Sequence, residues 1–180
     1  NYLPENVDNI PKRLNEIQNW LSHHISREDI IHFHNMNLGK NPLLTVAVSQ
    51  LAEEGFYVLN HAHDFAEDRP VNMEFLNRII GTELGMNPRS VMYPDLTNYV
   101  FATLNSADKQ RLIDYQVKES STFLLPNPVD IASNIHNDNR IKLKQSICSQ
   151  LGLDWNKLLI TYPVRVIRRK NIGEFILLSV

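Results

Sequence analysis

The fold is decided by residues 29–60, which read DIIHFHNMNLGKNPLLTVAVSQLAEEGFYVLN. Residues 29–34 are rich in β-branched and aromatic side chains, which predicts a strand. Asn41 and Pro42 form a typical N-cap and first-turn pair, and they predict a helix that ends at Gly55. Residues 56–60 are a second apolar run and a second predicted strand. A strand, a helix and a strand in so short a stretch form a βαβ unit, whose strands run parallel.

The same alternation of helices and strands continues on both sides of this unit. Helices are predicted at residues 10–24, 72–84, 107–115 and 140–151, the third of them capped by Ser106. Further strands are predicted at residues 99–104, 121–125 and 158–166, and Asn171 precedes a last helix. This order predicts an α/β fold with a Rossmann-like parallel sheet and flanking helices, in a doubly wound arrangement.

The composition changes along the chain and predicts its division into domains. Residues 1–130 carry the first α/β domain, and residues 131–139 are polar and Asn-rich, which indicates a linker. Residues 140–180 are predicted to begin a second domain. The chain starts without Met and ends on an apolar run, so both ends are expected to be cuts through a larger protein.

Charge and composition argue against several classes of protein. The formal net charge is -2, so no general attraction to nucleic acid or to an anionic membrane is expected. The sequence contains no run of about 18 apolar residues, so no transmembrane segment is predicted. The amino end lacks the features of a signal peptide. Cys148 is the single cysteine, so neither an internal disulfide nor a Cys-based zinc site is expected. A cytoplasmic protein is predicted.

Four histidines end or follow the first two predicted strands. His32 and His34 belong to the first, and His61 and His63 follow the second. Residues i and i+2 share a face of a strand, and strands joined by one crossover are often neighbours. The four rings are therefore expected to lie together near the carboxyl ends of the strands, where such sheets bind ligands.

Three roles are open for these histidines. They could pack in the sheet with local hydrogen bonds. With Asp64 they could bind a metal, because imidazole and carboxylate suit zinc, iron or manganese. They could also recognise a sugar or a phosphate, with His63 and Asp64 nearest the cleft, and this role is favoured. Glu67 and Arg69 stand in the loop after the second cluster, either as contacts to an acceptor sugar or as part of a solvated turn. Asn35 begins a loop at the same sheet edge that could contact a substrate phosphate through backbone N–H groups.

A basic cluster occurs near the end of the chain. Arg165, Arg168, Arg169 and Lys170 fall within six residues, and they repel each other unless an anion lies among them. Lys170 stands at the start of a predicted helix, whose N–H groups also attract anions. Arginine can bind a phosphate through two hydrogen bonds, and lysine adds a point charge. The alternative is a basic turn that is either solvated or paired with Glu174.

Taken in order, these segments resemble the retaining glycosyltransferases of the GT-B architecture, in particular glycosyltransferase family 4. Residues 29–34 resemble its D-hydrophobic-H-x-H strand, and residues 58–64 resemble a strand that ends in a His-Asp pair. Residues 105–112 resemble the family's helix start, and residues 125–130 resemble its hinge. Residues 140–153 resemble the helix that follows, and residues 164–171 resemble its G-R-…-K-G motif. Val164, Asn171 and Pro128 stand where the family usually has glycine, which indicates an atypical member.

The resemblance implies a function and roles for single residues. The reaction would transfer a hexosyl group from a nucleotide-diphosphate sugar to a carbohydrate or small-molecule acceptor. Arg165 and Lys170 would bind the donor diphosphate, and His63, with His61 and Asp64, would face the reacting sugar. His34, Asn35, Glu67 and Arg69 are then candidates for the acceptor side. No metal or other cofactor is implied. The family's acceptor loop and its paired glutamates have no counterpart here, so the chain alone is expected to be inactive.

Two other functions compete with glycosyl transfer. One is a metal-dependent hydrolase that uses His32, His34, His61, His63 and Asp64. The other is a non-catalytic module that binds a nucleotide or a sugar phosphate. The hydrolase predicts one bound metal per chain, whereas the module predicts affinity without turnover.

Overall fold

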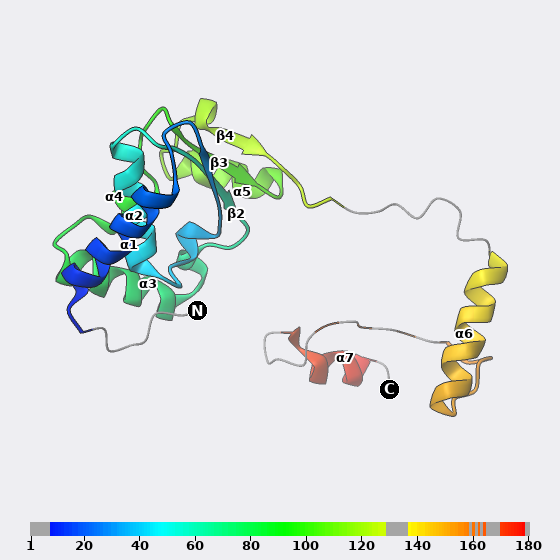
Figure 1. Cartoon of the computed structure of the whole chain (residues 1–180). Coiled ribbons are helices and arrows are strands. Elements are labelled where there is room, and N and C mark those ends of the chain that lie inside the picture. The colour runs from blue at the N-terminus through cyan, green and yellow to red at the C-terminus, as the bar shows by residue number, and fades with distance from the viewer. Residues whose placement is uncertain are drawn as a thin grey trace. The chain divides into compact units, whose positions relative to one another are not determined.

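The computed structural model describes residues 8–128, 137–158, 160, 162, 164 and 170–178. They belong to two compact units, Asn1–Pro128 and Val129–Val180. The first unit contains a β-sheet with its helices, and the second contains the helices α6 (Asn137–Leu151) and α7 (Ile172–Leu178) (Figure 1).

The first unit is built on a four-stranded parallel sheet in the order β1-β2-β3-β4. Its strands are β1 (Ile30–His34), β2 (Tyr57–Ala62), β3 (Tyr99–Thr103) and β4 (Thr122–Leu124). In the register of the sheet, Ile31 lies opposite Val58, and Val58 lies opposite Tyr99. The predicted α/β fold with a Rossmann-like parallel sheet is confirmed.

Helices and short turns precede or connect the strands. Helix α1 (Ile10–His24) comes first, and the turn η1 (Met36–Leu38) and helix α2 (Pro42–Glu53) join β1 to β2. The connection from β2 to β3 contains η2 (Ala66–Asp68), α3 (Pro70–Leu76), the π-helical η3 (Asn77–Glu83) and α4 (Pro88–Met92). Helix α5 (Ser106–Asp114) and the turn η4 (Glu119–Ser121) join β3 to β4.

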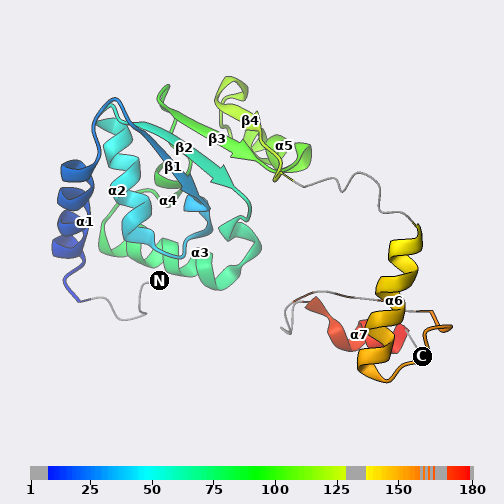
Figure 2. The ribbon, with the colours of Figure 1, turned by 45° about the vertical axis from the view of Figure 1, so that its right-hand side comes forward.

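The connecting helices lie on one face of the sheet (Figure 2). The strand order follows the chain order. Crossovers between parallel strands are right-handed as a rule, so successive crossovers are expected on the same side. Side chains on the other face are open, with Ile30, Tyr57 and Phe123 exposed by 69%, 56% and 52%. Helices on both faces, as in the doubly wound arrangement that was expected, would need a reversal of strand order, which these four strands do not have.

The hydrophobic core fills the space between the sheet and its helices. Leu43 and Val46 of α2 are completely buried, and so is Phe101 of β3. Helix α1 packs on α2 through Leu14 and Leu21, which recur at helical spacing. Burial of such a side chain stabilises the fold by roughly 1.5–3 kcal/mol, so this contact layer holds the strands in place.

The N-terminal caps of three helices can be compared with the predictions from the sequence. The side chain of Asn41 accepts a hydrogen bond from the N–H of Leu44, as expected for the cap of α2. The cap of α5 is Asn105 and not the predicted Ser106, because the extended backbone of Asn105 directs its Oδ1 to the N–H of Asp108 at 2.9 Å. Helix α4 was not predicted, although Asn87 before it caps the helix in the same way.

The second unit differs from its prediction in two places. Helix α6 begins at Asn137, earlier than the predicted start at Arg140. Residues 158, 160, 162 and 164 belong to no strand, and the rest of the predicted strand 158–166 lies outside the described residues. Among the described residues of this unit, Cys148 is the one buried side chain. No helix in the described part of the chain is long and apolar enough to cross a membrane.

Replacement of Gly39 by alanine should destabilise the first unit. Gly39 has a φ of 74°, and a Cβ atom there would lie 2.5 Å from the buried side chain of Leu76. Gly85 also has a positive φ, of 64°, but no atom lies near its added Cβ. The left-handed conformation costs alanine roughly 1–2 kcal/mol at either position. Overpacking should add about 1–3 kcal/mol in Gly39→Ala alone. Urea unfolding of Gly39→Ala and Gly85→Ala measures the difference, and equal losses would contradict the close approach.

Candidate functional site

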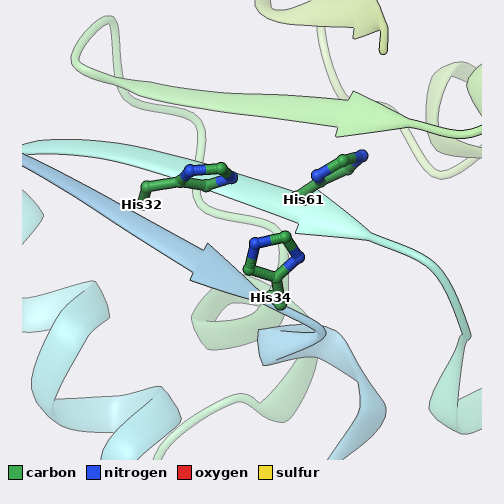
Figure 3. A group of neighbouring side chains, drawn as sticks. All are labelled: His32, His34 and His61. Atoms are coloured by element: carbon green, nitrogen blue, oxygen red, sulfur yellow. The ribbon is translucent and has the colours of Figure 1, made fainter. Parts of the chain in front are cut away.

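The carboxyl ends of β1 and β2 bring the four histidines together, as predicted. The parallel register places His34 directly opposite His61. The ring centroids of His34 and His61 are 5.1 Å apart, and those of His61 and His63 are 4.4 Å apart. The ring centroids of His32 and His34, which share a face of β1, are 4.6 Å apart. Figure 3 shows three of these rings, His32, His34 and His61, gathered beside the two strands.

His61 is the buried member of the group, with 5% of its surface exposed, whereas His32 and His34 are exposed. Its Nε2 lies 3.0 Å from the carbonyl oxygen of Leu125. A carbonyl oxygen only accepts hydrogen bonds, so Nε2 is the donor, and the tautomer that fits this contact has its lone pair on Nδ1. Nδ1 of His61 is buried and has no hydrogen-bond partner. The structure therefore presents an unpaired lone pair inside the histidine group.

His34 and His63 form a direct pair. Nδ1 of His34 lies 3.1 Å from Nε2 of His63, so one ring donates to the other. Partial desolvation lowers the pKa of both rings, and the neighbouring histidines lower it further, with Asp64 opposing this at His63. The pair therefore favours its neutral form, in which each ring has one donor and one acceptor nitrogen.

Asn35 holds the ends of β1 and β2 together. Its Oδ1 accepts hydrogen bonds from the backbone N–H groups of His63 and Asp64, at 2.7 and 3.0 Å. Its own N–H donates to the carbonyl of His61 at 3.0 Å. Its φ of 61° is one that asparagine tolerates better than most residues. The Oδ1 of Asn35 is thus used inside the protein. The place of Asn35 in a substrate-side loop stays a prediction.

The loop after β2 is tied down by polar pairs. Nη2 of Arg69 lies 2.8 Å from the carboxylate of Asp64. The hydroxyl of Tyr93 donates to the carboxylate of Glu67 at 3.0 Å, and burial, with Glu67 nearby, raises the pKa of this hydroxyl. Glu67 and Arg69 were predicted as acceptor contacts or solvated residues. In the structure, both have partners within the first unit.

Asp68 and Arg111 form a further pair that sequence reasoning missed. The guanidinium donates to both carboxylate oxygens of Asp68, at 2.7 and 2.9 Å, and to the hydroxyl of Tyr115 at 2.9 Å. It also lies 4.3 Å from the ring centroid of Phe65. No local pattern in the sequence connects Asp68 with a residue so distant in the chain.

The predicted diphosphate-binding residues are only partly described. Lys170 is half-buried and stands shortly before α7. Arg165 lies outside the described residues, so the geometry of this pair is not part of the described structure.

The fold is that of a Rossmann-like α/β protein, and a group of four histidines lies at the carboxyl ends of its first two strands. No protein-family model matches the chain, and no solved structure matches it. It is similar to the mannosylglucosyl-3-phosphoglycerate synthase of Petrotoga mobilis, with 33% identity over 169 residues. The match covers 91% of this chain and 32% of the relative, so the chain spans about a third of the relative's length. The chain is thus homologous to part of a glycosyltransferase, in line with the predicted resemblance.

Removal of the Asn35 acceptor should loosen the site. Asn35→Gly keeps the left-handed backbone accessible but leaves the N–H groups of His63 and Asp64 without their acceptor. A loss of about 1–3 kcal/mol in the free energy of unfolding is expected. Asn35→Asp, which keeps an acceptor oxygen, is the matched control and should lose less. Urea unfolding measures both, and a glycine variant as stable as the parent would contradict the bridging role.

The stability of the first unit should depend on pH through the ionisation of Asp68. Hydrogen bonds from Arg111 lower the pKa of Asp68 below 3.8. The pair therefore stabilises the fold fully above the unfolded-state pKa of about 4, and this contribution is lost as the pH falls through the lower folded-state pKa. The Asp68→Asn variant should have a free energy of unfolding about 1 kcal/mol lower than that of the parent at pH 7. On acidification it should lose less stability than the parent.

Thermal unfolding between pH 7 and pH 2 measures this difference. Asp95→Asn is the control, since Asp95 pairs with Lys118 through one contact of 2.7 Å between two largely exposed side chains. An Asp68→Asn variant with the parent's acid dependence would show that the pair contributes nothing.

Proposed function

We propose that the chain is part of a retaining glycosyltransferase of the GT-B architecture and of the family 4 type. It transfers a hexosyl group from a nucleotide-diphosphate sugar to an acceptor. The observation that carries this proposal is the 33% identity to the Petrotoga synthase over 91% of the chain. The parallel sheet supports it, because such sheets bind ligands at the carboxyl ends of their strands.

The name of the Petrotoga protein suggests the first reaction to assay. The named product contains a mannosyl, a glucosyl and a 3-phosphoglycerate unit. Transfer of mannose from a nucleotide donor to glucosyl-3-phosphoglycerate is therefore the leading version of the proposed reaction. An acceptor of this kind is small and anionic, which agrees with the small-molecule acceptor expected from the sequence.

On the donor side, Arg165 and Lys170 bind the diphosphate. Cleavage of the bond to the sugar leaves negative charge on the phosphate oxygens of the departing nucleotide. Cations placed there in advance bind the transition state more strongly than the ground state and lower the barrier. Arginine contributes two parallel hydrogen bonds, and lysine contributes a compact charge.

On the acceptor side, His63 faces the reacting sugar. Its ring is half-buried, and its backbone N–H is held by Asn35 at 2.7 Å. A neutral imidazole can donate one hydrogen bond and accept another, which suits sugar hydroxyl groups. Asp64 follows it with a carboxylate paired to Arg69, and His61 lies next to it in the ring group. We assign contact with substrate to His63 and positioning to His61 and Asp64.

The proposed domain order follows the sequence. Residues 1–130 form most of the acceptor-side domain, residues 131–139 the linker, and residues 140–180 the start of the nucleotide-sugar-binding domain. The donor site of this architecture lies between two complete domains, so the experiments require the full-length protein. The hydrolase and the non-catalytic module remain alternatives, and the same assays separate them from transfer.

Full-length protein should transfer mannose from a nucleotide donor, and His63→Asn should lower kcat by about 10²–10³, as loss of one group that stabilises a transition state does. His23→Asn is the matched control, because His23 lies on α1 and hydrogen-bonds to the carbonyl of Asn19. Product formation followed by mass spectrometry measures both. Full-length protein that releases no nucleotide diphosphate from any nucleotide sugar offered would refute the proposed transfer.

Lys170→Ala should raise the donor KM and lower kcat/KM in the full-length enzyme. The expected loss is roughly tenfold to a hundredfold, as for a hydrogen bond to a charged group. Lys142→Ala on α6 removes an exposed charge from the same unit and serves as the control. Equal effects of the two variants would assign Lys170 to the solvated surface.

A further inference from the structure

Three imidazole groups converge on one side of the β1–β2 pair (Figure 3). One ring nitrogen from each of His32, His34 and His61 lies within 4.8 Å of the others. A tetrahedral zinc ion with Zn–N bonds of about 2.0–2.1 Å holds its nitrogens about 3.3 Å apart. The remaining gap of about 1.5 Å is within the reach of side-chain rotation, since His32 and His34 are exposed.

His61 supplies the observation that points to a ligand. Its Nδ1 carries a lone pair, is buried, and has no hydrogen-bond partner. A buried acceptor without a partner costs about 1–3 kcal/mol, so such atoms call for an occupant. The opposite nitrogen donates to the carbonyl of Leu125 at 3.0 Å. Metal-binding histidines typically have this arrangement, in which a backbone carbonyl fixes the tautomer and leaves the other nitrogen for the ion.

His34 has an equivalent support. Its Nδ1 lies 3.1 Å from Nε2 of His63. If Nδ1 donates this hydrogen bond, Nε2 of His34 keeps its lone pair for an ion, and His63 acts as the outer partner. The backbone register of β1 and β2 fixes the spacing between His34 and His61, so two of the three ligands start from a rigid framework.

The chemistry of the donors selects the kind of ion. The set contains three imidazoles and no carboxylate, since Asp64 is paired with Arg69. Imidazole nitrogen suits zinc, copper, nickel and iron, whereas magnesium and calcium prefer oxygen. Three protein ligands leave a fourth position open to water or an anion, as in catalytic zinc sites.

We propose that His32, His34 and His61 bind one divalent transition-metal ion of the zinc type, with Nδ1 of His61 as its buried ligand. Ion binding at this site requires neither a nucleotide sugar nor a second domain, so it can be tested separately from the proposed glycosyl transfer, although the two share His61. It departs from the sequence-based expectation of a metal-free protein.

Zinc binding to the full 180-residue chain tests the site directly. The protein is produced without a polyhistidine tag, stripped with a chelator and titrated with zinc chloride by calorimetry. One ion per chain is expected. Loss of a residue that only hydrogen-bonds to a metal ligand weakens metal binding by about 10- to 100-fold. Because His61 is proposed as a direct ligand, His61→Ala should weaken zinc binding by more than this. His23→Asn and His24→Asn, which change two exposed histidines on α1, should bind zinc as the parent does.

A second probe and a second variant keep the test decisive. Cobalt(II) should give visible absorption bands of a four-coordinate site in the parent chain and lose them in His61→Ala. His32→Gln changes an exposed strand position and should weaken zinc binding comparably, even if His61→Ala does not fold as judged by circular dichroism. Absence of stoichiometric zinc in the parent, or binding that is lost in the α1 variants and kept in His32→Gln, would overturn the proposal.

Discussion

The parallel pairing of β1 with β2 is the constraint on which the rest of the first unit depends. Backbone hydrogen bonds in a parallel ladder fix one register, and a shift by one residue would move every side chain to the opposite face. In the observed register His34 lies opposite His61, and Asn35 joins the two strand ends through its side chain and its backbone. The site therefore inherits its geometry from main-chain pairing and does not need long, flexible side chains to create it.

The same topology explains why His32 and His34 are accessible. Strands that follow one another in space as they do in sequence receive all their crossover helices on one face, and the apolar side chains of that face form the core. The opposite face carries His32 and His34 together with exposed Ile30 and Tyr57. A buried sheet face and an open one thus arise from one chain path, and the polar site lies on the open face near the carboxyl ends.

The proposed glycosyl transfer and the proposed metal binding would use neighbouring parts of this site. His63 is assigned to the sugar, whereas His32, His34 and His61 are assigned to an ion, and the hydrogen bond between His34 and His63 connects the two groups. An ion on His34 would fix the orientation of that ring and hence the proton position between the two imidazoles. The proposed glycosyl transfer rests on homology to about a third of a glycosyltransferase. The proposed metal binding rests on the geometry of the histidines.

The sequence by itself determined the βαβ unit, the cap of α2 and the gathering of the four histidines. These features follow from local periodicity, from short-range capping and from the rule that consecutive parallel strands are neighbours. Only the tertiary structure decided that Asn35 bridges the strand ends, that Tyr93 holds Glu67, and that Leu125 fixes the tautomer of His61. These contacts join residues 28, 26 and 64 positions apart, and no local pattern encodes them. They arise because packing brings distant elements within hydrogen-bond range, where a buried polar group must find a partner.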